Sequence, residues 1–281
     1  MPARASLRIF SLALCLFQLL LPGCHRKQAG VSVVGSTSVQ PFAEALAEEF
    51  MAGHSAEKIF IQGGGSTAGI QAVLTGASQV GMSSRKLEES EKNLIAIPII
   101  YDAIAVIVHR TNPLNNLSMD QIRKVYAGKV TRWNELQGPD RAITVVTREE
   151  GSGTRETFQN LVMGKNEEIR LGALVQDSNG AIRQVVADDP NAIGYISLGL
   201  VNHRVKGLQI NGVDANVENI KKHQYQIIRP FLFVFKKKPQ GIAKGFLDFI
   251  LSPQGQNLLI HEGLVGATAI PTARPNNPGN A

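Results

Sequence analysis

The sequence of 281 residues predicts an α/β fold built as two lobes with mostly parallel sheets. Short apolar runs typical of strands alternate with helix-like stretches over the first third of the chain, each pair joined by a Gly/Ser/Thr-rich loop. Two long extended apolar runs, residues 95–109 and 225–235, flank a middle block. We therefore expect the chain to cross from one lobe to the other and later return.

Three strand–loop–helix units begin the predicted first lobe. Val31–Val34 forms the first strand, and Phe42, Leu46 and Phe50 recur at the spacing of one helix face. The same alternation then predicts a strand over Lys58–Ile61, a helix over Ala68–Leu74 and a strand over Val80–Met82. In parallel sheets ligands bind beyond the carboxyl ends of the strands, which is where the three loops would lie.

The middle and last parts of the chain continue the alternation of predicted strands and helices. The run over 95–109 is interrupted by Pro98 and Asp102, which favours two successive strand segments and excludes a membrane span. Ser118 is placed to cap a helix, and Trp133 follows in a connector. The remaining predicted elements are strands over Ile143–Val146, Ile193–Ile196 and Tyr225–Phe235, and helices over Ile182–Val186, Ile242–Ile250 and Gln254–His261.

Three loops share one composition that favours an anion. They are Gly35–Ser38, Gly63–Thr67 and Gly151–Thr154, and each opens a predicted helix. A helix start presents free N–H groups and partial positive charge, hydroxyls add donors, and glycine allows a close backbone approach. For each loop taken alone, ordinary N-capping is the favoured explanation. Three in one chain predict a shared oxyanion site.

Arg148 strengthens the prediction for the third loop. Its guanidinium is permanently charged and can hold an oxyanion through two parallel hydrogen bonds. Glu150, two residues later, is placed to orient it. The net charge of +6 suits an anionic ligand without proving one.

Enzymatic and nucleic-acid functions find little support in the sequence. There is no G-x-S-x-G elbow and no Walker A motif, and the six histidines show no metal-ligand spacing. Ser66 or Ser152 would need a nearby base to act as a nucleophile, and the sequence indicates none. Few aromatics and no basic helix argue against nucleic acid. We expect no enzyme activity, no cofactor and no metal.

The first 23 residues have the pattern of an export signal. Arg4 and Arg8 precede an apolar stretch, Ile9–Leu21, of signal-peptide length. The segment ends in Leu21-Pro22-Gly23-Cys24, which resembles the lipobox of bacterial lipoproteins and implies cleavage before Cys24 and its lipidation. An ordinary cleaved signal and an uncleaved anchor remain alternatives. Cys15 is the only other cysteine, so the mature chain would have no intrachain disulfide.

Four motifs in order resemble the phosphate-binding proteins of ABC-type phosphate importers. These are Val33–Val39, Gly64–Thr67, Gly81–Arg85 and Arg148-x-x-Gly151-Ser152-Gly153-Thr154-Arg155. Asn191–Tyr195 and Tyr101–Val106 fit the same family, so the resemblance covers nearly all of the mature chain.

The resemblance implies a periplasmic-binding-protein fold of the type II-like class, in which hinge closure clamps the ligand between lobes. It implies a first lobe over 25–108 and 229–272 and a second over 109–228. Independently of the resemblance, the Pro-, Asn- and Gly-rich composition predicts a disordered tail over 273–281. Carried over position by position, the phosphate ligands would be Ser38, Val39, Ser66, Thr67, Ser84, Arg85, Arg148, Ser152, Gly153 and Thr154. The implied protein is a monomeric, lipid-anchored receptor on the periplasmic or extracellular side that delivers inorganic phosphate to an ABC permease.

One position departs from the family pattern. Many members carry an aspartate after the third strand that accepts a proton from bound phosphate, and Ser84 stands there, followed by Arg85. A hydroxyl can accept a hydrogen bond from that proton, but it rejects fully ionised sulfate less strongly because it brings no charge repulsion. Other tetrahedral oxyanions, namely sulfate, molybdate and tungstate, therefore stay open as ligands. A secreted phosphoester hydrolase is the alternative from another class.

Overall fold

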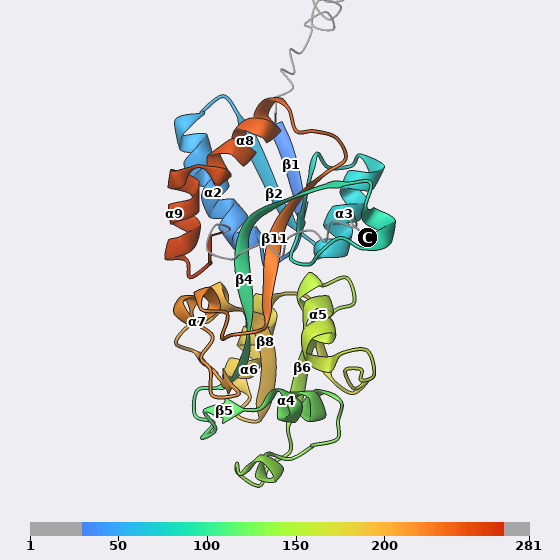
Figure 1. Ribbon diagram of the computed structural model, residues 1–281, viewed down its shortest axis with the longest axis vertical. Coiled ribbons are helices and arrows are strands. Elements are labelled where there is room, and N and C mark those ends of the chain that lie inside the picture. Colours follow the sequence, from blue (N-terminus) through green and yellow to red (C-terminus); the bar gives the residue numbers. More distant parts are fainter. Residues whose placement is uncertain (1–29, 267–281) are drawn as a thin grey trace, which may run out of the picture.

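Two lobes are stacked along the long axis of the molecule, and strand β4 (Ile95–His109) runs through both (Figure 1). The computed structural model describes residues 30–266. Strand β11 (Ile228–Phe235) lies antiparallel beside β4 at the crossing. Together they join the lobes within one continuous sheet of order β2-β1-β3-β11-β4-β8-β6-β7, with β9 paired to β4. The predicted α/β fold with two lobes is confirmed.

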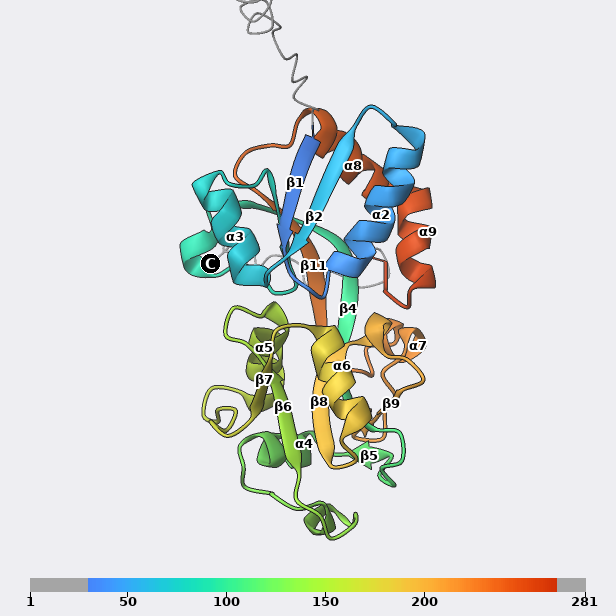
Figure 2. The ribbon, with the colours of Figure 1, turned by 180° about the vertical axis from the view of Figure 1, so that it is seen from behind.

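The first lobe places three parallel strands against helices. Valines and isoleucines of the strands pack on Phe42, Leu46 and Phe50, the helix face expected from their spacing. The rear view shows β1 and β2 beside α2 and α3 (Figure 2). The elements are β1 (Gly30–Gly35), α2 (Gln40–Gly53), β2 (Lys58–Gly63), α3 (Ser66–Thr75), β3 (Val80–Ser83), η2 (Glu89–Glu91), α8 (Gly241–Leu251) and α9 (Pro253–His261).

The second lobe surrounds strands β6 and β8 with shorter helices. Ser118 caps α4 as expected, because its hydroxyl accepts the Gln121 N–H at 3.1 Å. Trp133 is fully buried in the core of this lobe. The elements are β5 (Asn116–Leu117), α4 (Met119–Tyr126), η3 (Trp133–Leu136), β6 (Thr144–Arg148), α5 (Gly153–Phe158), η4 (Gln159–Met163), β7 (Leu174–Gln176), α6 (Asn179–Asp188), β8 (Ala192–Ser197), η5 (Leu198–Leu200), β9 (Val205–Gly207), β10 (Gln209–Ile210) and α7 (Val217–Lys221).

Strand β4 corrects one expectation. It is one strand rather than two segments, and its residues 104–108 pair with β8. Asp102 does not break the strand because Arg229 is its register partner on β11. Pro98 is accommodated by a register shift between Phe231 and Leu232. Proline has no backbone N–H to donate to the neighbouring strand, so an irregular register at Pro98 sacrifices few hydrogen bonds.

The parallel strands of the first lobe all end at the boundary between the lobes. Gly35 at the end of β1 is in register with Gly63 of β2 and with Met82 of β3. The loops that follow these strands therefore meet at one edge of the sheet, as parallel topology requires. This edge faces the start of α5 in the second lobe (Figure 1).

Several expectations concern residues outside the described range. The signal peptide over residues 1–23, the lipidation site Cys24 and the tail over 273–281 all lie there. Within residues 30–266, no helix combines the length and the apolar character that crossing a bilayer requires.

Candidate functional site

Hydroxyl groups from both lobes gather where the loops meet. The hydroxyl cluster, as we name it, consists of Ser36, Ser38, Ser66, Ser84 and Thr154, each at most 2% exposed. Such complete burial of hydroxyls is unusual, because each must find a hydrogen-bond partner away from water.

The first-lobe hydroxyls of the cluster bond to one another. Ser36 Oγ donates to Ser84 Oγ at 2.9 Å, and Ser66 Oγ lies 3.3 Å from Ser84 Oγ. Ser66 Oγ also accepts the Ser84 N–H at 3.0 Å. These contacts join the first, second and third strand loops of the first lobe into one polar surface.

The second lobe closes onto this surface. Ser38 Oγ lies 2.8 Å from Thr154 Oγ1, and the Thr67 N–H donates to the Gly151 carbonyl at 3.2 Å. A Cβ at Gly153 would lie 2.4 Å from Ser66 Oγ, so only glycine permits this approach. Gly65, with φ of 91°, gives the second loop a backbone that other residues rarely adopt.

Capping explains only one of the three loops. The hydroxyl of Ser152 caps α5 by accepting the Arg155 N–H at 3.3 Å. Helices α2 and α3 have no side-chain cap, and their N-cap positions are Val39 and Gly65. The Val39 N–H donates to the Ser36 carbonyl at 3.1 Å. The serine hydroxyls of the first two loops, those of Ser36, Ser38 and Ser66, are therefore directed into the cluster. Thr37 instead accepts from Arg148, and the predicted ligand Thr67 is exposed.

Arg148 lies at the end of β6, only 1% exposed, and reaches the first loop. Its Nη2 donates to Thr37 Oγ1 and to the Asp177 carbonyl, both at 3.0 Å. Its Nη1 is buried and has no hydrogen-bond partner among the described residues. An arginine that is buried with one nitrogen unpaired retains a strong donor for an anion.

The carboxylate that orients Arg148 is Glu149, which corrects the expectation for Glu150. Glu149 accepts from Arg148 Nε at 2.8 Å and from Nη2 at 2.7 Å, whereas Glu150 is exposed. The strand ends at Arg148 and the chain turns there, so the adjacent side chain folds back onto the guanidinium.

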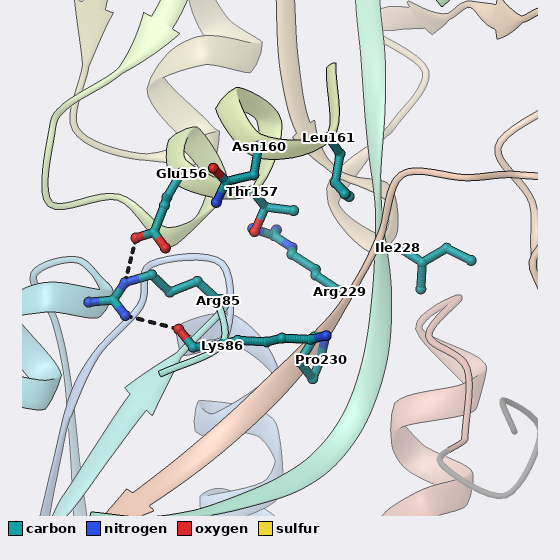
Figure 3. Close-up of a pocket in the computed structure, with 9 residues that line it drawn as sticks. All are labelled: Arg85, Lys86, Glu156, Thr157, Asn160, Leu161, Ile228, Arg229 and Pro230. Carbon is teal, nitrogen blue, oxygen red and sulfur yellow. Dashed lines mark hydrogen bonds and ion pairs between the residues drawn. The ribbon is translucent and has the colours of Figure 1, made fainter. Parts of the chain in front are cut away.

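Arg85 does not join the cluster. Its guanidinium bonds both oxygens of Glu91 at 2.8 Å, and Nε pairs with Glu156 of α5 at 2.7 Å. Figure 3 shows the Arg85 side chain pointing to Glu156 and away from Arg229. The hydrogen bonds from Arg85 hold the pKa of Glu91 below its usual value. The side chain predicted to bind the ligand instead links the two lobes.

A buried ion pair that sequence reasoning missed lies at the crossing of the lobes. Arg229 donates to Asp102 Oδ2 from Nε at 3.0 Å and from Nη2 at 2.8 Å. Arg229 Nη1 also donates to Thr154 Oγ1 at 2.7 Å. Burial raises the pKa of the Asp102 carboxyl, against the opposing effect of Arg229, and burial lowers the pKa of Arg229. The sequence signal for this pair was one charged residue within each apolar run, Asp102 in residues 95–109 and Arg229 in residues 225–235.

A pocket of ≈190 Å³ adjoins the site on the outer side of Arg229 (Figure 3). Arg85 and Lys86 line it from the first lobe, and Glu156 and Asn160 from the second. Thr157 Oγ1 and Arg229 Nη1 both contact the Ser84 carbonyl, at 3.4 and 3.5 Å, which separates the pocket from the hydroxyl cluster.

The chemistry that the site offers is hydrogen-bond donation to an anion. Nucleophilic catalysis would need a base beside a serine, and neither Ser66 nor Ser152 has one as a hydrogen-bond partner in the part of the chain that is described. Over residues 30–266, no three His, Cys, Asp or Glu side chains gather as a metal site requires. No carboxylate bonds to a cluster hydroxyl among these residues.

Comparison with known proteins agrees with this geometry. Residues 24–254 match the family model of the PBP superfamily domain. The phosphate-binding protein PstS of Bacillus subtilis is 31% identical over 261 residues, which cover 91% of this chain and 86% of that protein.

Two solved structures are similar over most of both chains. A substrate-binding protein of a phosphate ABC transporter from Clostridium perfringens, solved with bound phosphate, is 43% identical with a TM-score of 0.82, covering 84% of this chain and 99% of that one. An ABC-type phosphate transport receptor from Vibrio cholerae is 36% identical with a TM-score of 0.70 over the same shares.

Proposed function

The chain belongs to the PBP superfamily and, within it, to the phosphate-binding proteins related to PstS, and on that premise we propose that it captures inorganic phosphate outside the cytoplasm for an ABC permease. In this role it is a receptor without catalytic activity. The ligand is held between the lobes and released when they separate.

One observation carries the assignment of an anion to this cleft. Arg148 of the second lobe is buried, its Nη2 donates to Thr37 in the first loop of the first lobe, and its Nη1 is unpaired among the described residues. A tetrahedral oxyanion offers acceptor oxygens in several directions, so it can receive donors from two lobes at once. The proposed ligands are Ser38, Ser66, Thr67, Ser84, Arg148, Ser152, Gly153 and Thr154. We leave out Arg85 and Val39 because the Arg85 guanidinium and the Val39 N–H are paired elsewhere.

Export and anchoring complete the proposal. The sequence signal ends at Cys24, and β1 begins at Gly30, so a lipid on that cysteine would tether the first lobe through a short linker. In this form the receptor works as a monomer on the periplasmic or extracellular face of a bacterial membrane.

The anion that the protein retains tests the function. The protein is purified in buffers free of phosphate and sulfate, denatured, and the released anions are separated by ion chromatography. We expect phosphate in a ratio that approaches one per chain. Sulfate, molybdate or tungstate in that ratio would contradict the phosphate assignment and favour the other oxyanion receptors.

A chromogenic phosphate ester tests the alternative of a hydrolase. We expect no turnover, because Ser66 and Ser152 have no base beside them in the described structure. Turnover that Ser66→Ala or Ser152→Ala abolishes would contradict the receptor proposal.

A further inference from the structure

Six buried side chains form a closed ring of hydrogen bonds that joins the crossing strands to both lobes. Asp102 and Arg229 form the ion pair on β4 and β11. From there the ring passes to Thr154 and Ser38, and returns through Asn179 and Ser197 to Asp102. All six side chains are at most 2% exposed.

Every link of the ring is short. Arg229 Nη1 donates to Thr154 Oγ1 at 2.7 Å, and Thr154 Oγ1 lies 2.8 Å from Ser38 Oγ. Asn179 Nδ2 donates to Ser38 Oγ at 2.9 Å. The Ser197 N–H donates to Asn179 Oδ1 at 3.0 Å, and Ser197 Oγ donates to Asp102 Oδ1 at 2.8 Å.

The chemistry of the partners fixes the direction of these bonds. A backbone N–H can only donate, so the Asn179 atom that faces Ser197 is the carbonyl oxygen, and the amide nitrogen must face Ser38. A guanidinium can only donate, so Thr154 Oγ1 must accept from Arg229. Ser38 and Thr154 each accept one bond, from Asn179 and Arg229 respectively. One of these two hydroxyls donates to the other across their 2.8 Å contact, so one proton of the pair is left for another acceptor.

We propose that Asn179 and Arg229 are positioning residues that orient the hydroxyl pair of Ser38 and Thr154, so that the proton left on the pair is donated to the bound oxyanion. Ser38 comes from the first lobe and Thr154 from the second, so the ring assembles this pair only when the lobes are closed. The ion pair of Asp102 and Arg229 anchors the ring, because the pairing of β4 with β11 holds these two residues opposite each other. This inference rests on the proposed function and concerns the same site.

A double-mutant cycle tests it, with phosphate affinity measured by calorimetry. Asn179→Leu removes the amide donor behind Ser38 at similar side-chain volume, and we expect about tenfold weaker phosphate binding. In the background of Ser38→Ala the same substitution should change affinity by less than about twofold, because the hydroxyl through which Asn179 acts is gone. Circular dichroism confirms that each variant is folded.

Asn112→Leu is the matched control. Asn112 is a buried asparagine of the second lobe near the far end of β4, and within residues 30–266 its hydrogen bonds go to His109, Leu114 and Lys206 and not to the ring. We expect unchanged phosphate affinity. Should Asn179→Leu not fold, Asn179→Asp keeps the size and the acceptor for Ser197 but turns the Ser38 proton toward the new carboxylate. It should weaken binding at least as much, again mainly through Ser38.

The outcomes separate the two claims. Wild-type protein that does not bind phosphate refutes the proposed function itself. Wild-type protein that binds phosphate, combined with equal losses from Asn179→Leu with and without Ser38, overturns this inference alone. Equal losses would mean that Asn179 supports the closed lobes and does not orient the hydroxyl.

Discussion

Arg148 is the cation that both the sequence and the structure place beside the Gly/Ser/Thr loops. Glu149 holds its Nε and Nη2, and Thr37 of the opposite lobe accepts from Nη2. The remaining nitrogen, Nη1, keeps its donor for a ligand. Residue by residue, the site is a set of donors whose directions are fixed by their neighbours.

Arg148→Ala should abolish detectable phosphate binding, a loss of at least about a hundredfold, because it removes a charged and buried donor. The fold should persist, since the cavity lies at the boundary of the lobes and not within either core. Calorimetry measures the affinity and circular dichroism the fold, with the half-exposed Arg132→Ala as control. Unchanged affinity would remove Arg148 from the site.

Ser84→Asp should widen the preference for phosphate over sulfate. Ser84 Oγ is fully buried beside Ser36 and Ser66, so a carboxylate there would accept a proton from phosphate and repel sulfate, which has none. We expect the wild type to prefer phosphate by a smaller margin, and the variant to increase the ratio about tenfold or more. An equal loss of affinity for phosphate and for sulfate in the variant would contradict this role for Ser84.

The sequence located the loops of the site but not the direction of its side chains. Parallel strand ends gather by topology, so Ser38, Ser66 and Thr154 were predictable together. Whether Glu149 or Glu150 meets Arg148 depends on a turn, and Arg85 turns away because Glu91 and Glu156 are closer partners. Arg229 went unpredicted because its partner Asp102 is distant in sequence, and only the pairing of β4 with β11 brings them together.

At the scale of elements, the loop after β3 joins the lobes through Arg85. This loop leads into η2, whose Glu91 binds the guanidinium, and α5 of the second lobe supplies Glu156. Strand β4 passes through both lobes without a loop, so composition has no signal for where one lobe ends, and the boundary at 108 stays a prediction.

The loop after β3 should also give the protein an acid-sensitive component of stability. Hydrogen bonds from Arg85 lower the pKa of Glu91 from its usual 4.5. As the pH falls, the unfolded chain therefore takes up this proton before the folded one does. The stabilisation is complete above the unfolded pKa and is lost as the pH falls through the folded pKa.

Glu91→Gln should therefore lower the free energy of unfolding at pH 7 and flatten its fall between about pH 5 and pH 3. Urea unfolding across that range measures both effects. The exposed neighbour Glu89→Gln serves as control and should behave like the wild type. An equally steep fall in Glu91→Gln would show that other carboxyls carry the acid sensitivity.

For the whole molecule, the contacts between the lobes describe a closed clamp. Ser38 meets Thr154, Thr67 meets Gly151, and Arg85 meets Glu156 across the boundary. Such contacts can form together only when β4 and β11 bring the lobes to one angle, which is how hinge closure couples binding to shape. The overall two-lobed fold was predictable because two long apolar runs flank a block with its own strands and helices.

Phosphate should therefore make the protein more compact. Small-angle X-ray scattering of protein freed of anions should show a radius of gyration that falls when phosphate is added. Arg148→Ala should show no such fall at the same phosphate concentration. An identical radius of gyration in both conditions for the wild type would mean that the lobes close without the ligand.

Calorimetric titration of anion-free protein with phosphate, and then with sulfate, tests whether the protein is a phosphate receptor. We expect saturable binding of one phosphate per chain, tighter than the binding of sulfate at neutral pH. Tighter binding of sulfate, or no saturable binding of phosphate, would contradict this function.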